Sequence, residues 1–326
     1  MKNKLIKLFS FLLIATLFLT GCGQTSAKTV STSTDSSDLH GTIAISGAFA
    51  LYPMMTTWAS EFQKIHPDVQ FDISAGGAGK GMTDTLAGAV DIGMISRTIT
   101  SDEESKGAYW VAVTKDAVFP VINTQNPVYA QLMAKGIPEE TFVKIFITGE
   151  ITTWGEVVGD ATNTDAIHVY TRSDACGAGD IWAKFLDNHV QDDIQGIGVN
   201  GDPGVLDAVA KDPLGIGYNN LGYVFDLASG AIVSGIQPVP IDVNADGSAS
   251  DNETVDSLKK AVDLISTDQY PAPPARLEYL ATKGKPSGLV QAFIEWILTD
   301  GQQYVSAAGY VQLTQDQLNT SLAKIQ

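Results

Sequence analysis

The chain has 326 residues, with 20 Lys and Arg against 37 Asp and Glu, which gives a formal net charge of −17. Nucleic acid is therefore not an expected partner, because a phosphate backbone requires a basic patch. Binding of a small anionic ligand is not excluded, since such a ligand responds to the local charge of its site more than to the net charge of the protein.

The first 38 residues have the pattern of a secretory signal and a tether. Basic residues precede a short apolar stretch at 8–19, which ends at Leu19-Thr20-Gly21-Cys22. This ending resembles the lipobox of bacterial lipoproteins, so residues 1–21 are expected to be a signal peptide and Cys22 to carry a lipid anchor. The polar residues 22–38 are expected to form the lipidated start and a flexible linker. The alternative is an ordinary signal peptide followed by a free Cys.

Strand-like runs then alternate with helical patterns. In chain order, the first group predicts a strand at 42–45, a helix at 52–65, a strand at 69–73, a helix at 79–89 and a strand at 90–95. The later runs predict strands at 117–123, 167–171, 215–218 and 277–282, and helices at 142–146, 180–189, 253–265, 287–298 and 301–308. This rhythm predicts an α/β fold with a mostly parallel sheet.

Two of these strands are expected to cross between two lobes. The strand at 117–123 would leave the first lobe, and the strand at 277–282 would return to it. Lobe 1 is then residues 39–118 and 277–326, and lobe 2 is residues 119–276. Two lobes with two crossings predict a hinge-bending binding protein, whose ligand lies in the crevice at the strand carboxyl ends.

Three glycine-containing turns, at 46–50, 76–81 and 176–179, each lead from a strand into a helix. Glycine lets the backbone approach a ligand, and a helix N-terminus presents free N–H groups. Each turn alone is more often plain turn chemistry, but their recurrence predicts one site for a tetrahedral oxyanion. Two arginines could add charge. The candidate anion-binding residues are Ala48, Phe49, Ala50, Ala78, Gly79, Lys80, Ser96, Arg97, Arg172, Cys176, Gly177 and Ala178.

Stretches across residues 41–313 resemble one family in sequence and in order. They are SGAFALYPMMTTWASEF, GGAGKGMTDTLAGAVDIGMISR, KIFITGEITTWGEV, RSDACGAGD, DPLGIGYNNLGYV, TKGKPSGLVQAFIEWIL and GYVQL. The chain resembles the phosphate-specific substrate-binding proteins of ABC importers, which have a type II periplasmic-binding-protein fold. The resemblance implies a monomer that binds phosphate, works with permease subunits, touches the membrane only through its lipid anchor, and requires no cofactor.

The turns nevertheless depart from the family. Family members bind phosphate through side-chain hydroxyls, whereas this chain has Phe49 and Ala50 in the first turn and Ala78 in the second. In the third turn, Cys176-Gly177-Ala178 stands where Ser-Gly-Thr is usual. We therefore expect this chain to share the backbone donors of the family's site and to lack most of its hydroxyl groups.

The charged residues depart in part as well. Arg97 stands where some members place an Asp that accepts the phosphate proton, whereas Arg172 and its expected partner Asp174 match the family. Arg97 and Lys80 would add positive charge. A site without an acceptor should distinguish poorly between oxyanions, so sulfate, molybdate and tungstate stay alternatives to phosphate.

Cys176 has no expected disulfide partner, because Cys22 serves as the anchor. The predicted helix start beside it would lower its pKa, which would suit a soft-ligand or redox role. The alternative is a small residue in a Ser position.

A calcium loop is also predicted. Residues 242–253 match the pattern D-x-[DN]-x-[DN]-G-x5-E of an EF-hand loop, but a strand precedes them instead of a helix. The expected ligands are Asp242, Asn244, Asp246, Ser248 and Glu253. An acidic surface turn is the alternative, and any calcium would be structural.

Two alternative functions are catalysis by an enzyme and ligand sensing by a module that serves a signalling receptor. The sequence contains no H-E-x-x-H, no G-x-S-x-G and no recognisable Ser-His-Asp set, so no enzymatic activity is expected. The sequence does not separate sensing from transport, because both functions use the same closed state.

Overall fold

A computed structural model describes residues 39–326, in which nine strands form a mixed sheet in the order β2-β1-β3-β9-β4-β7-β5-β6, with β8 paired to β4. The strands are β1 (Gly41–Gly47), β2 (Val69–Ala75), β3 (Ile92–Ile95), β4 (Ala108–Asn123), β5 (His168–Arg172), β6 (Ile197–Val199), β7 (Gly215–Asn220), β8 (Ile236–Pro238) and β9 (Ala275–Lys283). The predicted signal peptide, Cys22 and linker lie outside the described residues.

Helices follow most of the strands. They are α1 (Tyr52–Ile65), α2 (Ala78–Ala87), α3 (Ser101–Ser105), α4 (Tyr129–Lys135), α5 (Glu139–Val143), α6 (Trp154–Val158), α7 (Gly177–Phe185), α8 (Gly201–Lys211), α9 (Leu221–Val224), α10 (Leu258–Ser266), α11 (Gly288–Leu298) and α12 (Gln315–Ile325). Short η segments are η1 (Phe49–Leu51), η2 (Lys144–Thr148), η3 (Gln191–Asp193) and η4 (Asp300–Tyr304). No helix among residues 39–326 is long and apolar enough to cross a membrane.

The buried hydrophobic residues form two clusters. One draws on residues 43–113 and 280–325, and the other on residues 117–270 together with Val311. Each cluster is the core of one lobe, since a domain is organised around one hydrophobic core. We call these the first and the second lobe. The expected lobe boundaries, at 118 and 277, fall in β4 and β9.

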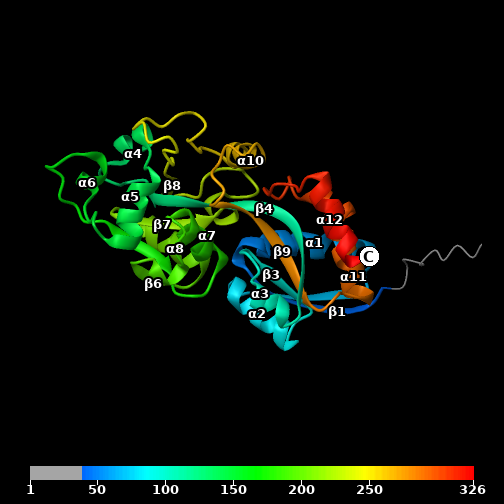
Figure 1. Cartoon of the computed structure of the whole chain (residues 1–326). Coiled ribbons are helices and arrows are strands. Elements are labelled where there is room, and N and C mark those ends of the chain that lie inside the picture. The colour runs from blue at the N-terminus through cyan, green and yellow to red at the C-terminus, as the bar shows by residue number, and fades with distance from the viewer. Residues whose placement is uncertain (1–38) are drawn as a thin grey trace, which may run out of the picture. The chain divides into compact units, whose positions relative to one another are not determined.

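Strands β4 and β9 run between the two cores. β4 pairs antiparallel with β9 from Ala108 to Ala117, and then with β7 from Val118 to Ile122. β1 pairs in parallel with β2 and β3, and β5 pairs in parallel with β6 and β7, so the parallel sections belong to the lobes and the antiparallel sections to the crossing. Figure 1 shows β4 and β9 side by side, with α11 and α12 near one end.

The helix predicted at 52–65 is α1, with the predicted bounds. Pro53 stands in its first turn, where the missing N–H costs no helical hydrogen bond. Its predicted face, which includes Met55, Trp58 and Phe62, is buried in the first lobe. The period of apolar residues was therefore sufficient to predict this element.

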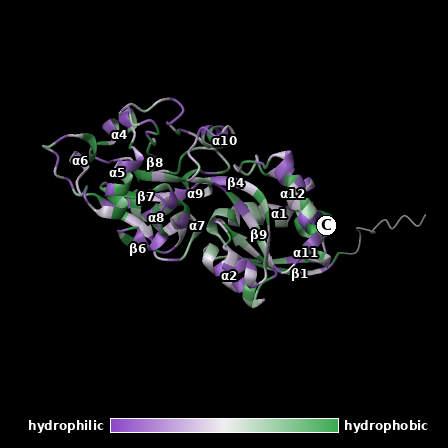
Figure 2. Ribbon diagram, viewed as in Figure 1, coloured by the Kyte–Doolittle hydropathy of each residue, from purple (hydrophilic) through white to green (hydrophobic). Residues whose placement is uncertain are grey.

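The sequence predicted only the second half of β4. The first half contains the buried polar residues Thr114 and Asp116, which interrupt the apolar pattern of a buried strand. Figure 2 shows hydrophilic residues on β4 and β9 in the section that runs between the two lobes. Asp116 belongs to a buried ionic cluster with Arg276 and Glu278, whereas the Thr114 hydroxyl donates to Val311 O at 2.9 Å.

Two predicted helices differ in the structure, and one helix was not predicted. The region at 301–308 is the short 3₁₀ segment η4 and turns. The helix predicted from residue 253 begins at Leu258, because the Ser257 side chain accepts a hydrogen bond from the Lys260 N–H and caps it there. Helix α8 was not predicted, since Gly201-Asp202-Pro203-Gly204 has the composition of a turn.

Candidate anion-binding site

The three predicted turns surround one small cavity, which is nearly closed in this structure. Nine of the twelve predicted residues line it: Ala48, Phe49, Ala50, Ala78, Ser96, Arg172, Cys176, Gly177 and Ala178. The remaining lining residues are Gly77, Asp202 and Asn220. Residues far apart in the chain thus meet at the carboxyl ends of strands from both lobes, as expected for an α/β crevice.

Each turn is held in place by its own backbone hydrogen bonds. The Ala48 N–H donates to Met94 O at 2.8 Å, and the N–H groups of Gly76 and Gly77 donate to Gly47 O at 2.9 and 3.0 Å. In the third turn, the Cys176 N–H donates to Gln191 Oε1 at 2.9 Å. These bonds fix the loops and leave helices α2 and α7 to begin at the cavity. The first N–H groups of a helix have no acceptor within the helix and can donate to an anion.

Glycine allows the two lobes to approach closely here. Gly77 has φ +89°, and a Cβ on it would lie 2.7 Å from Ala175 O. A Cβ on Gly177 would lie 2.0 Å from Ser96 Oγ. The Gly79 N–H donates to Ala175 O at 3.2 Å across the lobes. The cavity is therefore closed between the lobes, and larger side chains at these positions would separate them.

Arg172, at the end of β5, provides a guanidinium group in the cavity. Its Nε donates to Asp174 Oδ1 at 2.8 Å and its Nη2 to Asp174 Oδ2 at 2.5 Å, so the predicted pair is confirmed. Its Nη1 donates to Asp202 Oδ2 at 2.5 Å. The guanidinium carbon lies 5.1 Å from the ring centre of Phe49, which contributes a cation–π contact from the first lobe.

The side chain of Arg172 is 1% exposed. Burial by itself lowers the pKa of this guanidinium, but Asp202 and Asp174 outweigh burial and raise its pKa. Arg172 therefore stays positively charged. Three of its five N–H groups are used by carboxylates, and two are left to donate to a ligand.

Asp202 and Asn220 were not among the predicted residues. Asp202 Oδ1 accepts hydrogen bonds from Asn220 Nδ2 at 2.5 Å and from the Asn220 N–H at 3.3 Å. Burial raises the pKa of the Asp202 carboxyl above its ordinary value, and Arg172 and Asn220 offset only part of this rise. The expectation of a site without an acceptor is thus wrong, because a buried carboxyl lines the cavity. The polar pair Asn219-Asn220 after a buried strand was the available signal.

Arg97, Lys80 and Gly79 do not line the cavity. Arg97 donates to both carboxylate oxygens of Glu103, at 3.0 and 2.6 Å, and to Thr98 O at 3.0 Å. Lys80 is half exposed and pairs with Asp84 one helical turn away. Both cations are held by acidic residues of their own lobe, so the expected extra positive charge is not delivered to the cavity.

The thiol of Cys176 accepts a hydrogen bond from the Gly179 N–H at 3.2 Å and caps α7. Burial raises the pKa of Cys176 to about 12, and the Arg172 charge opposes this only in part. The expected lowering of its pKa is therefore wrong. Cys176 has a neutral thiol in the place where a Ser would cap the helix.

The predicted calcium loop uses its acidic groups internally. Asp242 Oδ2 accepts from the Gly247 N–H at 2.9 Å, and Glu253 Oε1 accepts from the Val243 N–H at 2.8 Å. Asp246 Oδ1 accepts from the Ser248 N–H at 2.9 Å, and Asn244 donates to Asp246 at 3.0 Å. Among residues 39–326, no group of three or more His, Cys, Asp or Glu side chains is arranged to hold a metal ion.

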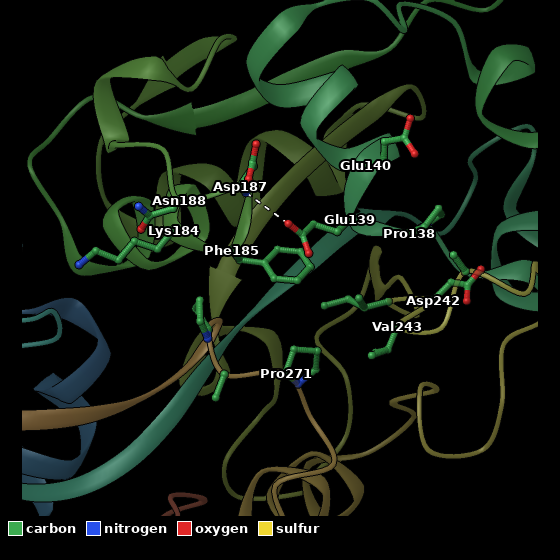
Figure 3. A pocket seen from close by; sticks show the side chains of 14 residues that line it. Pro138, Glu139, Glu140, Lys184, Phe185, Asp187, Asn188, Asp242, Val243 and Pro271 are labelled. Atoms are coloured by element: carbon green, nitrogen blue, oxygen red, sulfur yellow. Dashed lines mark hydrogen bonds between the residues drawn. The ribbon is translucent and has the colours of Figure 1, made fainter.

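A larger hollow lies in the second lobe, with an empty volume of about 1060 Å³ (Figure 3). Its rim carries the carboxylates of Glu139, Glu140, Asp187 and Asp242, and Lys184 is the cation among the residues that line it. This surplus of negative charge does not suit an anion. Although this hollow is larger, the charges therefore favour the small cavity at Arg172.

Comparisons with known proteins agree with the fold. A model of the PBP superfamily domain matches residues 24–301. This chain belongs to the PBP superfamily. It is 27% identical to the phosphate-binding protein PstS of Bacillus subtilis (strain 168) over 322 residues, which cover 96% of this chain and 95% of that relative.

Solved structures show that this PBP-superfamily chain has a two-lobed type II periplasmic-binding-protein fold. A candidate phosphate ABC transporter substrate-binding protein from Clostridium perfringens, with bound phosphate, matches at a TM-score of 0.68 and 22% identity. An ABC-type phosphate transport receptor from Vibrio cholerae matches at a TM-score of 0.60 and 19% identity. Each match covers 84% of this chain and 100% of the other.

Proposed function

We propose that this protein is an extracytoplasmic binding protein that captures inorganic phosphate between its lobes and delivers it to the permease of an ABC importer. The observation that carries the proposal is the buried Arg172 in a closed cavity at the starts of α2 and α7. The relatives named above for phosphate binding and phosphate transport support the same ligand.

The cavity suits a small tetrahedral anion. Arg172 has two N–H groups left, and the starts of α2 and α7 add backbone donors, so several hydrogen bonds can converge on one ligand. The alanines at positions 78 and 178 offer no hydroxyl. Most donors in this site therefore come from the backbone and the guanidinium.

Asp202 favours phosphate over sulfate, molybdate and tungstate. At neutral pH, phosphate still carries at least one proton, whereas the other three anions carry none. Asp202 forms an ion pair with Arg172, and as a carboxylate it can accept a hydrogen bond from a protonated phosphate, whereas it repels a bare anion as a like charge. The site thus has a group that distinguishes these oxyanions.

The same residues do not support catalysis. The cavity nucleophiles are Ser96 and Cys176, and the raised pKa of Cys176 keeps its thiol protonated at neutral pH. The residues that line the cavity include no histidine to act as a base. We therefore assign binding and delivery to this protein and no enzymatic activity.

Calorimetry of the mature protein tests the proposal. We expect phosphate to bind one site per chain, and sulfate, molybdate and tungstate to bind at least about tenfold more weakly, because one lost hydrogen bond and one like-charge contact exceed 1.4 kcal/mol. Tighter binding of any of these three anions than of phosphate would reject phosphate as the ligand.

We further propose that Cys22 anchors the protein to the outer face of the cytoplasmic membrane. The lipobox-like sequence that ends at Cys22 supports this, together with the polar residues that follow it. Cys22→Ser should release the protein from the membrane fraction of the cells. Retention of the variant in that fraction would contradict the proposed anchor.

A further inference from the structure

Arg172 is joined to β4 and β9, the strands that run between the lobes, by a continuous series of buried polar side chains. Arg172 donates to Asp202, Asn220 donates to the other oxygen of Asp202, and Arg276 Nη2 donates to Asn220 Oδ1. We call the series Arg172–Asp202–Asn220–Arg276 the polar relay. Its members lie at the end of β5, on α8, at the end of β7 and on β9, so it joins four elements.

Arg276 is itself fixed by both crossing strands. Its Nε donates to Asp116 Oδ1 on β4 at 2.8 Å and to Glu278 Oε1 on β9 at 3.0 Å, and its Nη2 donates to Asp116 Oδ2 at 3.2 Å. The side chains of these three residues are at most 4% exposed. Because buried ion pairs tolerate little displacement, Arg276 presents Nη2 to Asn220 from a fixed position.

Arg276 also determines which way the Asn220 amide faces. The amide oxygen accepts from Arg276, so the amide nitrogen must face Asp202. A reversed amide would bring its nitrogen against the guanidinium and its oxygen against the Asp202 carboxylate. The Asn219 side chain adds support by donating to Asp202 O at 2.9 Å.

We propose that Asn220 and Arg276 are positioning residues of the anion site. They hold Asp202 so that it engages Nη1 of Arg172, and this leaves the two remaining N–H groups of Arg172 directed for the ligand. The inference rests on the proposed phosphate-binding function for its ligand, but the relay itself exists without ligand. It makes the affinity of the cavity depend on Asn220, in the cavity wall, and on Arg276, which lies on β9 and does not line the cavity.

Asn220→Leu tests the relay, because leucine keeps the approximate size of the side chain and removes both hydrogen bonds. The matched control is Asn123→Leu. Asn123 is also a buried asparagine of the second lobe, and its Nδ2 donates to Val209 O and Ala210 O at 2.9 Å each, away from the cavity. Both variants should lose stability, and only Asn220→Leu should lose affinity.

The first readout is the phosphate Kd by calorimetry. We expect Asn220→Leu to weaken binding about tenfold or more, and Asn123→Leu to stay within about threefold of the wild type. Equal affinity in both variants would overturn the positioning role. If Asn220→Leu does not fold, Asn220→Asp keeps the acceptor for Arg276, replaces the donor by a second carboxylate beside Asp202, and should show the same loss.

The second readout needs no ligand and therefore separates the relay from the proposed function. Urea unfolding without phosphate is measured for Asn220→Leu, Arg172→Met and the double variant, and again with Asn123→Leu in place of Asn220→Leu. For Asn220→Leu with Arg172→Met, the relay predicts that the unfolding equilibrium constant of the double variant departs about threefold or more from the additive value. For Asn123→Leu with Arg172→Met, it predicts additivity. Additivity in the first pair would overturn the relay, whereas absent phosphate binding in the wild type would overturn only the proposed function.

Discussion

Asp202 accepts a hydrogen bond from Nη1 of Arg172 at 2.5 Å, inside the cavity where the anion is proposed to bind. Arg172 ends β5, and Asp202 lies in the first turn of α8. A ligand would thus meet an arginine that is already paired with a carboxylate on two sides, since Asp174 holds its other edge. Arg172 can therefore be oriented before the anion arrives, and its net attraction for a bare anion is reduced.

Replacing Asp202 should change selectivity more than affinity for phosphate. Asp202→Asn keeps the size of the side chain and removes the charge that opposes a bare anion, so we expect the sulfate-to-phosphate Kd ratio to fall about tenfold or more. Competition calorimetry measures the ratio. Asp212→Asn is the control, because Asp212 binds His168 and Tyr170 away from the cavity. An unchanged ratio in Asp202→Asn would remove Asp202 from the account of selectivity.

The two arginines of the sequence analysis should behave differently. Arg172→Lys loses the planar fork that binds two carboxylates and the anion together, and should weaken phosphate binding about a hundredfold or more. The phosphate Kd of Arg97→Lys should stay within about threefold of the wild-type value, because Arg97 is bound by Glu103 outside the cavity. Phosphate titrations of both variants measure this difference. Comparable losses in the two variants would contradict the assignment of the site to Arg172.

The buried ionic cluster should give the protein a pH-dependent stability. Burial raises the pKa of Glu278 well above its ordinary value, and Asp116 raises it further, whereas Arg276 opposes the shift. A carboxyl whose pKa is raised in the folded state binds more protons folded than unfolded. Its contribution to stability is therefore full below the unfolded pKa, near 4.5, and is lost as pH rises toward the folded value.

Glu278→Gln should remove this dependence, because an amide stays neutral and keeps an oxygen that can accept from Arg276 Nε. We expect the free energy of unfolding of the wild type, relative to the variant, to fall steadily as pH rises above about 4.5. Urea unfolding of both proteins at several pH values gives the difference. A wild-type advantage that grows with pH would show that Glu278 is ionised in the folded protein.

Calcium binding by residues 242–253 stays a prediction. If the loop binds calcium, an excess of about a hundred times Kd should add about 2.7 kcal/mol of stability, which moves the melting temperature by several degrees. Glu253→Gln should remove most of that shift, because it weakens the expected bidentate ligand. Melting curves with chelator and with calcium decide the matter. No shift in the parent, or an equal shift in the variant, would leave the loop an acidic turn.

The sequence was sufficient for the elements that follow a simple period, such as α1 and the strands that lead into the three turns. It failed where polar groups are buried. Thr114 and Asp116 interrupt the pattern of β4, and Gly201-Asp202-Pro203-Gly204 has the composition of a turn although it begins α8. The residues missed for this reason include Asp202, which decides the chemistry of the cavity.

Asp174 was predicted as a partner of Arg172, but the partners of the other charged residues were not. Nothing in the local sequence distinguishes Arg97, which is bound by Glu103, from Arg172, which lines the cavity. Arg97 follows β3 and Arg172 ends β5, and a helix comes next in the chain after each. Only the packing of the two lobes decides which guanidinium reaches the ligand, and this depends on contacts between distant parts of the chain.

A crystal structure of the mature protein grown with phosphate tests the central claim most directly. We predict one phosphate between the lobes, within hydrogen-bond distance of Arg172 and of backbone N–H groups at the starts of α2 and α7, with one of its oxygens facing Asp202. A phosphate bound elsewhere, for example in the hollow of Figure 3, or an empty cavity at saturating phosphate, would contradict the account.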